Sequence, residues 1–121
     1  MSARVDRCLG VKLLHPTRCC DECPWRRDQP AGRFPPARYK ALRGSCEQGL
    51  APMFACHKSP EAEPFACAGY VLVEGGQGSP RNFNLRMALA RGRCDPRAIT
   101  TDPASLWPSF EAMAAFNGCD D

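Results

Sequence analysis

The densest cluster of reactive side chains in this sequence is CCDECPW, residues 19–25, where three cysteines fall within five positions. Pro24 and Trp25 follow the last of them directly. The chain holds 9 cysteines in 121 residues, and a domain of this length builds only a modest hydrophobic core. The cysteines therefore constrain the fold more than any other feature. They can bind metal, act as a redox dithiol, form disulfides or simply pack.

The context of the cysteines disfavours disulfides. Residues 1–16 carry Arg4, Asp6, Arg7 and Lys12 and lack the apolar run of a signal peptide. No apolar stretch is long enough to span a membrane, so we expect a soluble cytoplasmic protein without membrane contact. Thiols stay reduced there, and clustered cysteines in such proteins more often bind metal or carry redox chemistry. The odd number of cysteines fits this reading, because a pure disulfide framework would leave one over.

Composition predicts a small single domain, residues 1–121, of the α+β class and mainly α-helical. The 12 prolines and 10 glycines favour short elements joined by irregular chain. We expect these loops to be organised around a cysteine-ligated metal. Residues 93–121 are expected to form a C-terminal helical tail.

Two helices have sequence signals at both ends. The segment 35–44 has prolines in its first turn, Tyr39 and Leu42 on one face, and Gly44 as the expected C-terminal cap. The segment 79–92 gives the clearest helix pattern. It has Ser79 as the expected cap, Pro80 in the first turn and Gly92 at the end, with an apolar stripe of Phe83, Met87 and Ala90.

Three further segments are predicted with less regular patterns. Residues 64–76 combine a β-branched end with helical spacing and terminal glycines, and we favour a helix. Residues 102–118 form one broken or two short helices, because Pro108 interrupts them; Asp102 and Ser109 are the expected caps. Residues 51–57 are expected to be extended, with Phe54 and Cys56 on the side opposite Met53, Ala55 and His57.

Four cysteines form a candidate metal-binding set. Cys20 and Cys23 have C-x-x-C spacing, which lets a tight turn present two sulfurs to one ion. Cys56, with His57 beside it, and Cys67 complete the set. Neighbours in an extended chain point to opposite sides, so either Cys56 or His57 is the ligand. The role of Cys19 stays open, and the remaining cysteines are expected to be buried as small hydrophobes: Cys8, Cys46, Cys94 and Cys119.

Zinc is the metal that best suits this set, because structural zinc sites are closed, cysteine-rich and able to organise a small domain. A [4Fe-4S] cluster is the alternative, since it also takes four thiolates and Cys-Pro pairs recur in cluster-binding loops. Four thiolates leave a negatively charged centre, which Arg26 can offset. Trp25 is expected to shield the sulfurs from water.

The motifs together resemble an uncharacterised family of small bacterial and phage proteins, a family with a domain of unknown function. The resemblance rests on CDECPWR, FPPARYKALR, MFACHKS, CAGYVL and an Asn and Arg within NFNLRMA, over about residues 20–92. It implies a bacterial or phage setting, with the host cytoplasm as the compartment, and no particular activity. The shared positions are Cys20, Cys23, Pro24, Trp25, Arg26, Met53, Phe54, Cys56, His57, Ser59, Cys67, Ala68 and Gly69.

We therefore expect a small protein with a structural zinc that acts on a protein or nucleic-acid partner, as a phage or bacterial regulatory or anti-host factor. One alternative is an iron–sulfur protein that binds nucleic acid or senses redox state. On a helix that continued past Gly92, Arg86 and Arg93 would lie on one side as a basic stripe usable on phosphates. The sequence does not indicate an oligomeric state.

A metal- or cysteine-dependent enzyme is the other alternative. A redox dithiol needs its C-x-x-C at the start of a helix, but here Pro24 follows the second cysteine and no βαβ pattern surrounds it. The H-x-E…P-C-x-x-C signature of zinc deaminases is also absent. The residues thus favour a binding protein over an enzyme, and no catalytic residue is assigned.

Overall fold

The computed structural model describes residues 13–47, 49–56, 65–76 and 80–118. Helices dominate these residues, and pairing between extended segments is limited to isolated bridges. The expectation of a small, mainly α-helical fold is confirmed, whereas its organisation around a metal stays a prediction. The elements are α1 (Pro36–Cys46), α2 (Ala68–Gly75), α3 (Phe83–Ala90), η2 (Pro96–Ala98), η3 (Pro103–Ser105) and α4 (Phe110–Phe116).

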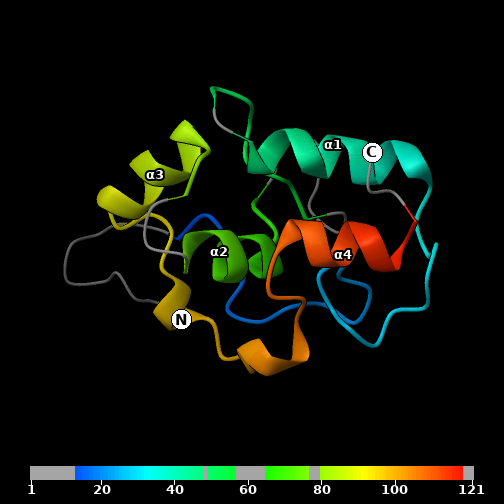
Figure 1. The fold of residues 1–121 in the computed structure, drawn as a ribbon. Helices are drawn as coiled ribbons and strands as arrows, with labels where there is room; N and C mark the ends of the chain where they lie inside the picture. Colours follow the sequence, from blue (N-terminus) through cyan, green and yellow to red (C-terminus); the bar gives the residue numbers. More distant parts are fainter. Residues whose placement is uncertain (1–12, 48, 57–64, 77–79, 119–121) are drawn as a thin grey trace.

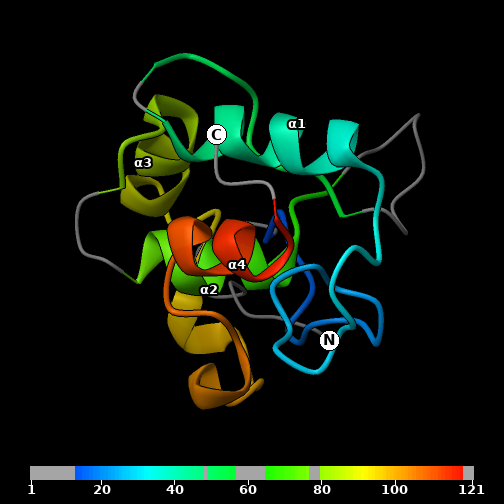
Figure 2. The same cartoon turned by 45° about the vertical axis from the view of Figure 1, so that its right-hand side comes forward.

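Helix α2 lies at the centre of the molecule, as Figures 1 and 2 show. It packs against α3 and η2, while α4 packs against α1. The first half of α2 is completely enclosed, since Tyr70 and Val71 are both 0% exposed. The irregular loop that carries the first cysteines runs along one side of this helical core (Figure 2). None of the helices seen in the described ranges is long and apolar enough to cross a membrane.

Helix α1 begins where the sequence predicts and ends later. Its first turn contains a proline and its buried face includes Tyr39 and Leu42, as expected. Gly44 is not its cap, because the helix continues to Cys46. Ser45 and Cys46 are 6% and 1% exposed, so their burial against the core extends the helix beyond the glycine.

Helix α3 begins three residues later than the sequence predicts. Asn82 caps it by accepting the backbone N–H three residues further along at 2.9 Å. Its amide also donates to the carbonyl of Ala51 at 2.9 Å. Pro80, which was expected in the first turn, therefore precedes the helix, and Ser79, the expected cap, lies outside the described residues. A second bond to a distant segment favours Asn82, and local sequence signals carry no information about that bond.

The buried face of α3 also differs from the expected stripe. Leu85 and Ala88 are buried, whereas Phe83 is 43% exposed, Met87 is half-buried and Ala90 is exposed. Apolar residues surround this short helix, so their spacing does not determine which face packs inwards. The end of the helix is as predicted, because glycine follows the Arg91 cap with φ of 73°.

The remaining expectations for local structure are confirmed in the described residues. Asp102 and Ser109 cap η3 and α4, each accepting a backbone N–H, at 2.9 and 3.1 Å. Residues 64–76 contain a helix, α2. Phe54 and Cys56 are buried, while the alternate residue Ala55 is exposed. His57 lies outside the described residues.

Candidate functional site

A cavity of about 310 Å³ lies between the loop of residues 16–24, the segments around Phe54 and Phe65, and the start of α2. Its lining is mainly apolar apart from thiols and two charged residues, Arg18 and Asp21. Five cysteines from three separate parts of the chain line it: Cys19, Cys20, Cys23, Cys56 and Cys67.

The first three cysteines are held by a turn that a distant segment supports. The N–H of Cys23 donates to the carbonyl of Cys20 at 3.3 Å, which closes the tight turn expected for C-x-x-C spacing. The N–H of Cys19 donates to Thr101 Oγ1 at 2.8 Å. The position of the turn relative to the core is thus fixed by a residue far along the chain.

The other two cysteines sit on paired extended segments. Ala55 and Ala66 form an antiparallel bridge. On either side of it, the N–H of Cys56 donates to the carbonyl of Phe65 and the N–H of Cys67 donates to the carbonyl of Phe54, both at 2.9 Å. This pairing places Cys56 opposite Phe65 and Cys67 opposite Phe54, so the two cysteines lie diagonally across the same face of the pair. Cys67 also occupies the N-cap position of α2, without a side-chain capping bond.

Some of the cavity sulfurs are in contact with one another. Cys23 Sγ lies 3.5 Å from Cys67 Sγ, and the thiol of Cys19 forms a hydrogen bond with Cys23. Two sulfurs on one tetrahedral zinc, at bond lengths of about 2.3 Å, lie about 3.8 Å apart. Within the described ranges, no three or more His, Cys, Asp or Glu side chains are close enough to hold one ion. A shared ion would therefore require two of the other cavity cysteines to move closer to Cys23 and Cys67.

The contacts between these thiols affect their ionisation. The pKa of Cys19 is raised by its hydrogen bond to Cys23 and by burial. At Cys23 the hydrogen bond from Cys19 lowers the pKa, but contact with Cys67 and burial outweigh it and raise the pKa overall. Both thiols are consequently protonated at neutral pH, and a bound cation would have to displace their protons.

A family model described as a family of unknown function, DUF6283, matches residues 15–121. The chain belongs to DUF6283. The match includes all five cavity cysteines and every described helix, so the resemblance to a family of unknown function is confirmed. Comparisons with curated proteins and with solved structures gave no match.

The sequence pattern missed Cys19 in this DUF6283 domain. Cys19 is 6% exposed and contacts Cys23, whereas Cys20, the cysteine in C-x-x-C spacing, is half-buried. The adjacent pair Cys19–Cys20 was the available signal. Without the path of the backbone, however, the sequence does not show which of two adjacent cysteines is buried. His57, the expected alternative to Cys56, lies outside the described residues.

Trp25 takes the enclosed position expected of it. Its side chain is 0% exposed, and its backbone carbonyl accepts the N–H of Trp107 at 2.9 Å. A Cβ atom added at Gly69 would lie 2.8 Å from Trp25 Cβ and 2.7 Å from Cys23 Sγ, so the loop approaches α2 closely at this point. The buried Nε1 of Trp25 has no hydrogen-bond partner in the described part of the chain.

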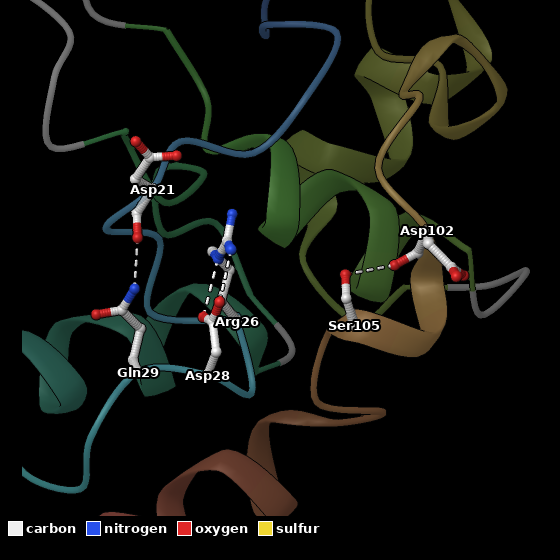
Figure 3. A network of polar contacts seen from close by, with 6 residues as sticks. All are labelled: Asp21, Arg26, Asp28, Gln29, Asp102 and Ser105. Atoms are coloured by element: carbon white, nitrogen blue, oxygen red, sulfur yellow. Dashed lines mark hydrogen bonds and ion pairs between the residues drawn. The ribbon is translucent and has the colours of Figure 1, made fainter.

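Arg26 does not hydrogen-bond the sulfurs. Its guanidinium forms two bonds to Asp28, at 2.9 and 2.6 Å, which Figure 3 shows beside the bond from Gln29 to the Asp21 carbonyl. This pairing raises the pKa of Arg26. Its charge still slightly lowers the pKa of Cys19, so the influence of Arg26 on the thiols is electrostatic only.

A second cation near the cavity was not foreseen from the sequence. Arg38 lies over the ring of Phe54, a cavity-lining residue, with its Cζ 5.3 Å from the ring centroid. Its Nε and Nη2 atoms are buried without a hydrogen-bond partner among the described residues. The sequence contains many arginines, and nothing in it distinguishes Arg38 as one with a buried guanidinium.

Two cysteines lie away from the cavity, as expected for buried hydrophobes. Cys46 and Cys94 are 1% and 2% exposed, and burial raises the pKa of Cys94 to about 12. The structure shows no disulfide among the seven cysteines of the described residues. Cys8 and Cys119 lie outside those residues.

The basic stripe expected on one helix is not formed. Helix α3 ends at Ala90, so Arg93 lies beyond it and only Arg86 belongs to the helix. Both side chains are exposed. The glycine turn after Arg91 redirects the chain and changes the direction expected for Arg93.

Proposed function

We propose that this DUF6283 chain is a small metal-binding protein, with Zn²⁺ held by the cavity cysteines in a structural role. The observation that carries the proposal is the convergence of five cysteines from three chain segments on one cavity. Cys23 and Cys67 are the central ligands, because their sulfurs are in van der Waals contact. Two of Cys19, Cys20 and Cys56 complete the set of four.

The short sulfur separation supports zinc as the ion. The 3.5 Å between Cys23 Sγ and Cys67 Sγ is close to the spacing of two ligands on one tetrahedral ion. Four cysteine ligands close the coordination sphere, which suits a structural rather than a catalytic ion. The energy of binding is then coupled to folding, because the three segments meet only in the folded chain.

The size of the cavity favours a second candidate, a [4Fe-4S] cluster. About 310 Å³ is far more than one ion occupies. A cluster of this kind takes four cysteine thiolates, each at its own iron, so its ligand sulfurs do not touch one another. The contact between Cys23 and Cys67 would then have to open, and for this reason zinc is preferred.

The decisive experiment is metal analysis of protein purified without oxygen, together with its visible absorption spectrum. We expect one zinc per chain and no visible band. Cys23→Ser and Cys67→Ser should lose the metal, whereas Cys94→Ser, the matched control, should retain it. Cys94 is equally buried but does not line the cavity.

Two results would count against zinc in different ways. Iron in the protein with charge-transfer absorbance would replace zinc with the cluster. A native chain without any metal, or full metal content in both Cys23→Ser and Cys67→Ser, would remove the metal proposal altogether.

We further propose that the metal-stabilised fold acts by binding a macromolecular partner, as a regulatory or anti-host factor of bacterial or phage origin. A closed four-cysteine site leaves no coordination position for a substrate. The surface of the domain, rather than the cavity, would then carry the activity.

A further inference from the structure

A groove of about 400 Å³ lies beside α3, and its lining includes the buried Ala88. It runs between α3 and the segments around Leu14 and Pro52. Apolar side chains form most of it, and three polar side chains stand at its edge. The apolar residues are Leu14, Pro52, Met53, Met87 and Ala88, and the polar residues are Asn84, Arg91 and Arg93.

Hydrogen bonds tie the walls of this groove together. The side-chain amide of Asn84 donates to the carbonyls of Leu50 and Ala51 at 3.0 and 2.9 Å. The N–H of Leu14 donates to the carbonyl of Arg93 at 2.8 Å. The three segments therefore keep their spacing without a ligand, and the groove is pre-formed.

The charge at the groove has one sign. Arg91 and Arg93 line the groove and are exposed, and the exposed Arg86 lies on α3, outside the lining. Among the described residues, no acidic side chain contributes to the lining. Through the ranges that the structure describes, none of these three arginines is in an ion pair. A ligand with negative charges would thus meet uncompensated cations.

Exposed apolar side chains continue from the groove. Leu50 is 75% exposed and Phe83 is 43% exposed. Both stand near the start of α3, where the N–H of Phe83 donates to the carbonyl of Gly49 at 2.9 Å. Large exposed hydrophobic residues next to an apolar groove are typical of a binding surface, and the two methionines in the lining adapt readily to apolar ligands.

We propose that this groove docks a short peptide segment of a partner protein in which an apolar anchor is flanked by aspartate or glutamate. The anchor would lie over Met53 and Met87, and the acidic residues would meet Arg91 and Arg93. The inference rests on the part of the proposed function that assigns a macromolecular partner, and it does not depend on the metal.

Two other occupants fit the groove less well. Single-stranded nucleic acid is held by stacking of bases on aromatic side chains, and the described part of the lining contains none. The chain's own segment 1–12 carries Arg4, Arg7 and Lys12 against one acidic residue, so its charge has the same sign as that of the groove.

The test is selection from a library of random displayed peptides on the metal-loaded protein, followed by fluorescence anisotropy with the best binder. We expect binders with Leu, Ile, Phe or Met between acidic residues, and affinity that weakens as salt rises. The double variant R91E/R93E should weaken binding by at least about tenfold. The control K40E/R97E has the same charge change outside the groove and should bind as the native chain does.

The proposal is overturned if selection yields no binder, or if R91E/R93E and K40E/R97E weaken binding equally. It is also overturned if oligo-dT binds more tightly than the selected peptide and loses binding in R91E/R93E. Metal content is measured on the same samples, which separates these outcomes from failure of the metal site. Loss of metal would disturb the whole fold, whereas the groove substitutions change one surface only.

Discussion

Gly69 is the residue at which the cysteine loop and α2 come closest. A Cβ atom there would lie 2.7 Å from Cys23 Sγ and 2.8 Å from Trp25 Cβ. Gly69→Ala should therefore lower the free energy of unfolding by about 1–3 kcal/mol, the usual cost of overpacking a core. Urea denaturation followed by circular dichroism measures this loss.

Gly44 provides the control for this substitution. It also lies in a helix, but an added Cβ would have no atom within 4 Å. Gly44→Ala should raise the free energy of unfolding by about 0.5–1 kcal/mol, because alanine favours the helix. If both variants changed stability in the same direction, the close approach at Gly69 would not determine the outcome.

His15 is buried in a way that requires its neutral form. Its Nδ1 donates to the carbonyl of Pro16 at 2.7 Å, and its Nε2 accepts the N–H of Asp95 at 2.9 Å. Burial lowers its pKa below 6.5, against smaller opposing effects of the Pro16 carbonyl and the Asp95 charge. The unfolded chain thus binds a proton more readily than the folded one, so this residue's contribution to stability is lost as pH falls below 6.5.

The expected result is a free energy of unfolding that declines with acidification below 6.5 in the native chain and declines less in His15→Gln. Comparing the two chains removes contributions common to both, including those of the thiols. Parallel curves for the two would show that protonation of His15 does not oppose folding.

The sequence predicted that cysteines form the candidate site, but it did not predict every cysteine that lines it. The spacing of Cys20 and Cys23 predicted a turn that the structure forms. Cys56 and Cys67 were identified as partners, and the bridge beside them places both on the cavity. The burial of Cys19 was not predictable, because it depends on a hydrogen bond to Thr101 that local sequence does not encode.

At the scale of elements, Asn82 both caps α3 and joins it to a distant segment. Its side chain is 0% exposed, accepts the N–H of Leu85 and donates to the carbonyl of Ala51. Asn82→Ala should lower the free energy of unfolding by about 2–3 kcal/mol, which combines the loss of a cap with that of a buried hydrogen bond. Thermal or urea unfolding gives the value.

Ser109→Ala is the matched comparison. Ser109 caps α4 with one bond of 3.1 Å, and the expected loss is about 1 kcal/mol. Equal losses in the two variants would mean that the bond from Asn82 to Ala51 adds nothing to stability.

The helices show why element prediction succeeded in some places and failed in others. For α4, Pro108 and Ser109 supply strong local signals, and the helix begins as predicted. For α3, the start and the buried face both depend on contacts with residues 49–51, which lie far away in sequence. Local capping signals and apolar spacing therefore predicted that α3 exists, but they did not predict its first residue or which of its faces is buried.

At the scale of the whole molecule, the C-terminal part of the chain supports the cysteine loop. Arg26 and Leu106 form an antiparallel bridge, and the N–H of Trp107 donates to the carbonyl of Trp25. The sequence suggested a separate helical tail after residue 92, because no motif was seen there. Such long-range pairing leaves no periodic pattern, so only the three-dimensional structure shows that this segment braces the candidate site.

This bracing connects the proposed metal to the stability of the whole domain. The loop carrying Cys23 contacts α2 through Gly69 and the C-terminal segment through Trp25. When the free ion concentration is about a thousand times its dissociation constant, binding to the folded chain adds about 4 kcal/mol to the free energy of unfolding. Chelation under reducing conditions should accordingly lower the midpoint of thermal unfolding by about 10–20 °C for a domain of this size.

The decisive comparison is between the native chain and Cys23→Ser, each heated with and without chelator. The variant lacks a central ligand, so chelator should not shift its midpoint further, and that midpoint should lie near the value for the chelated native chain. Unfolding should remain a single transition, because the loop joins α2 to the C-terminal segment and these cannot lose structure independently. A native midpoint unaffected by chelator, with the metal shown to be removed, would contradict a structural role for the ion.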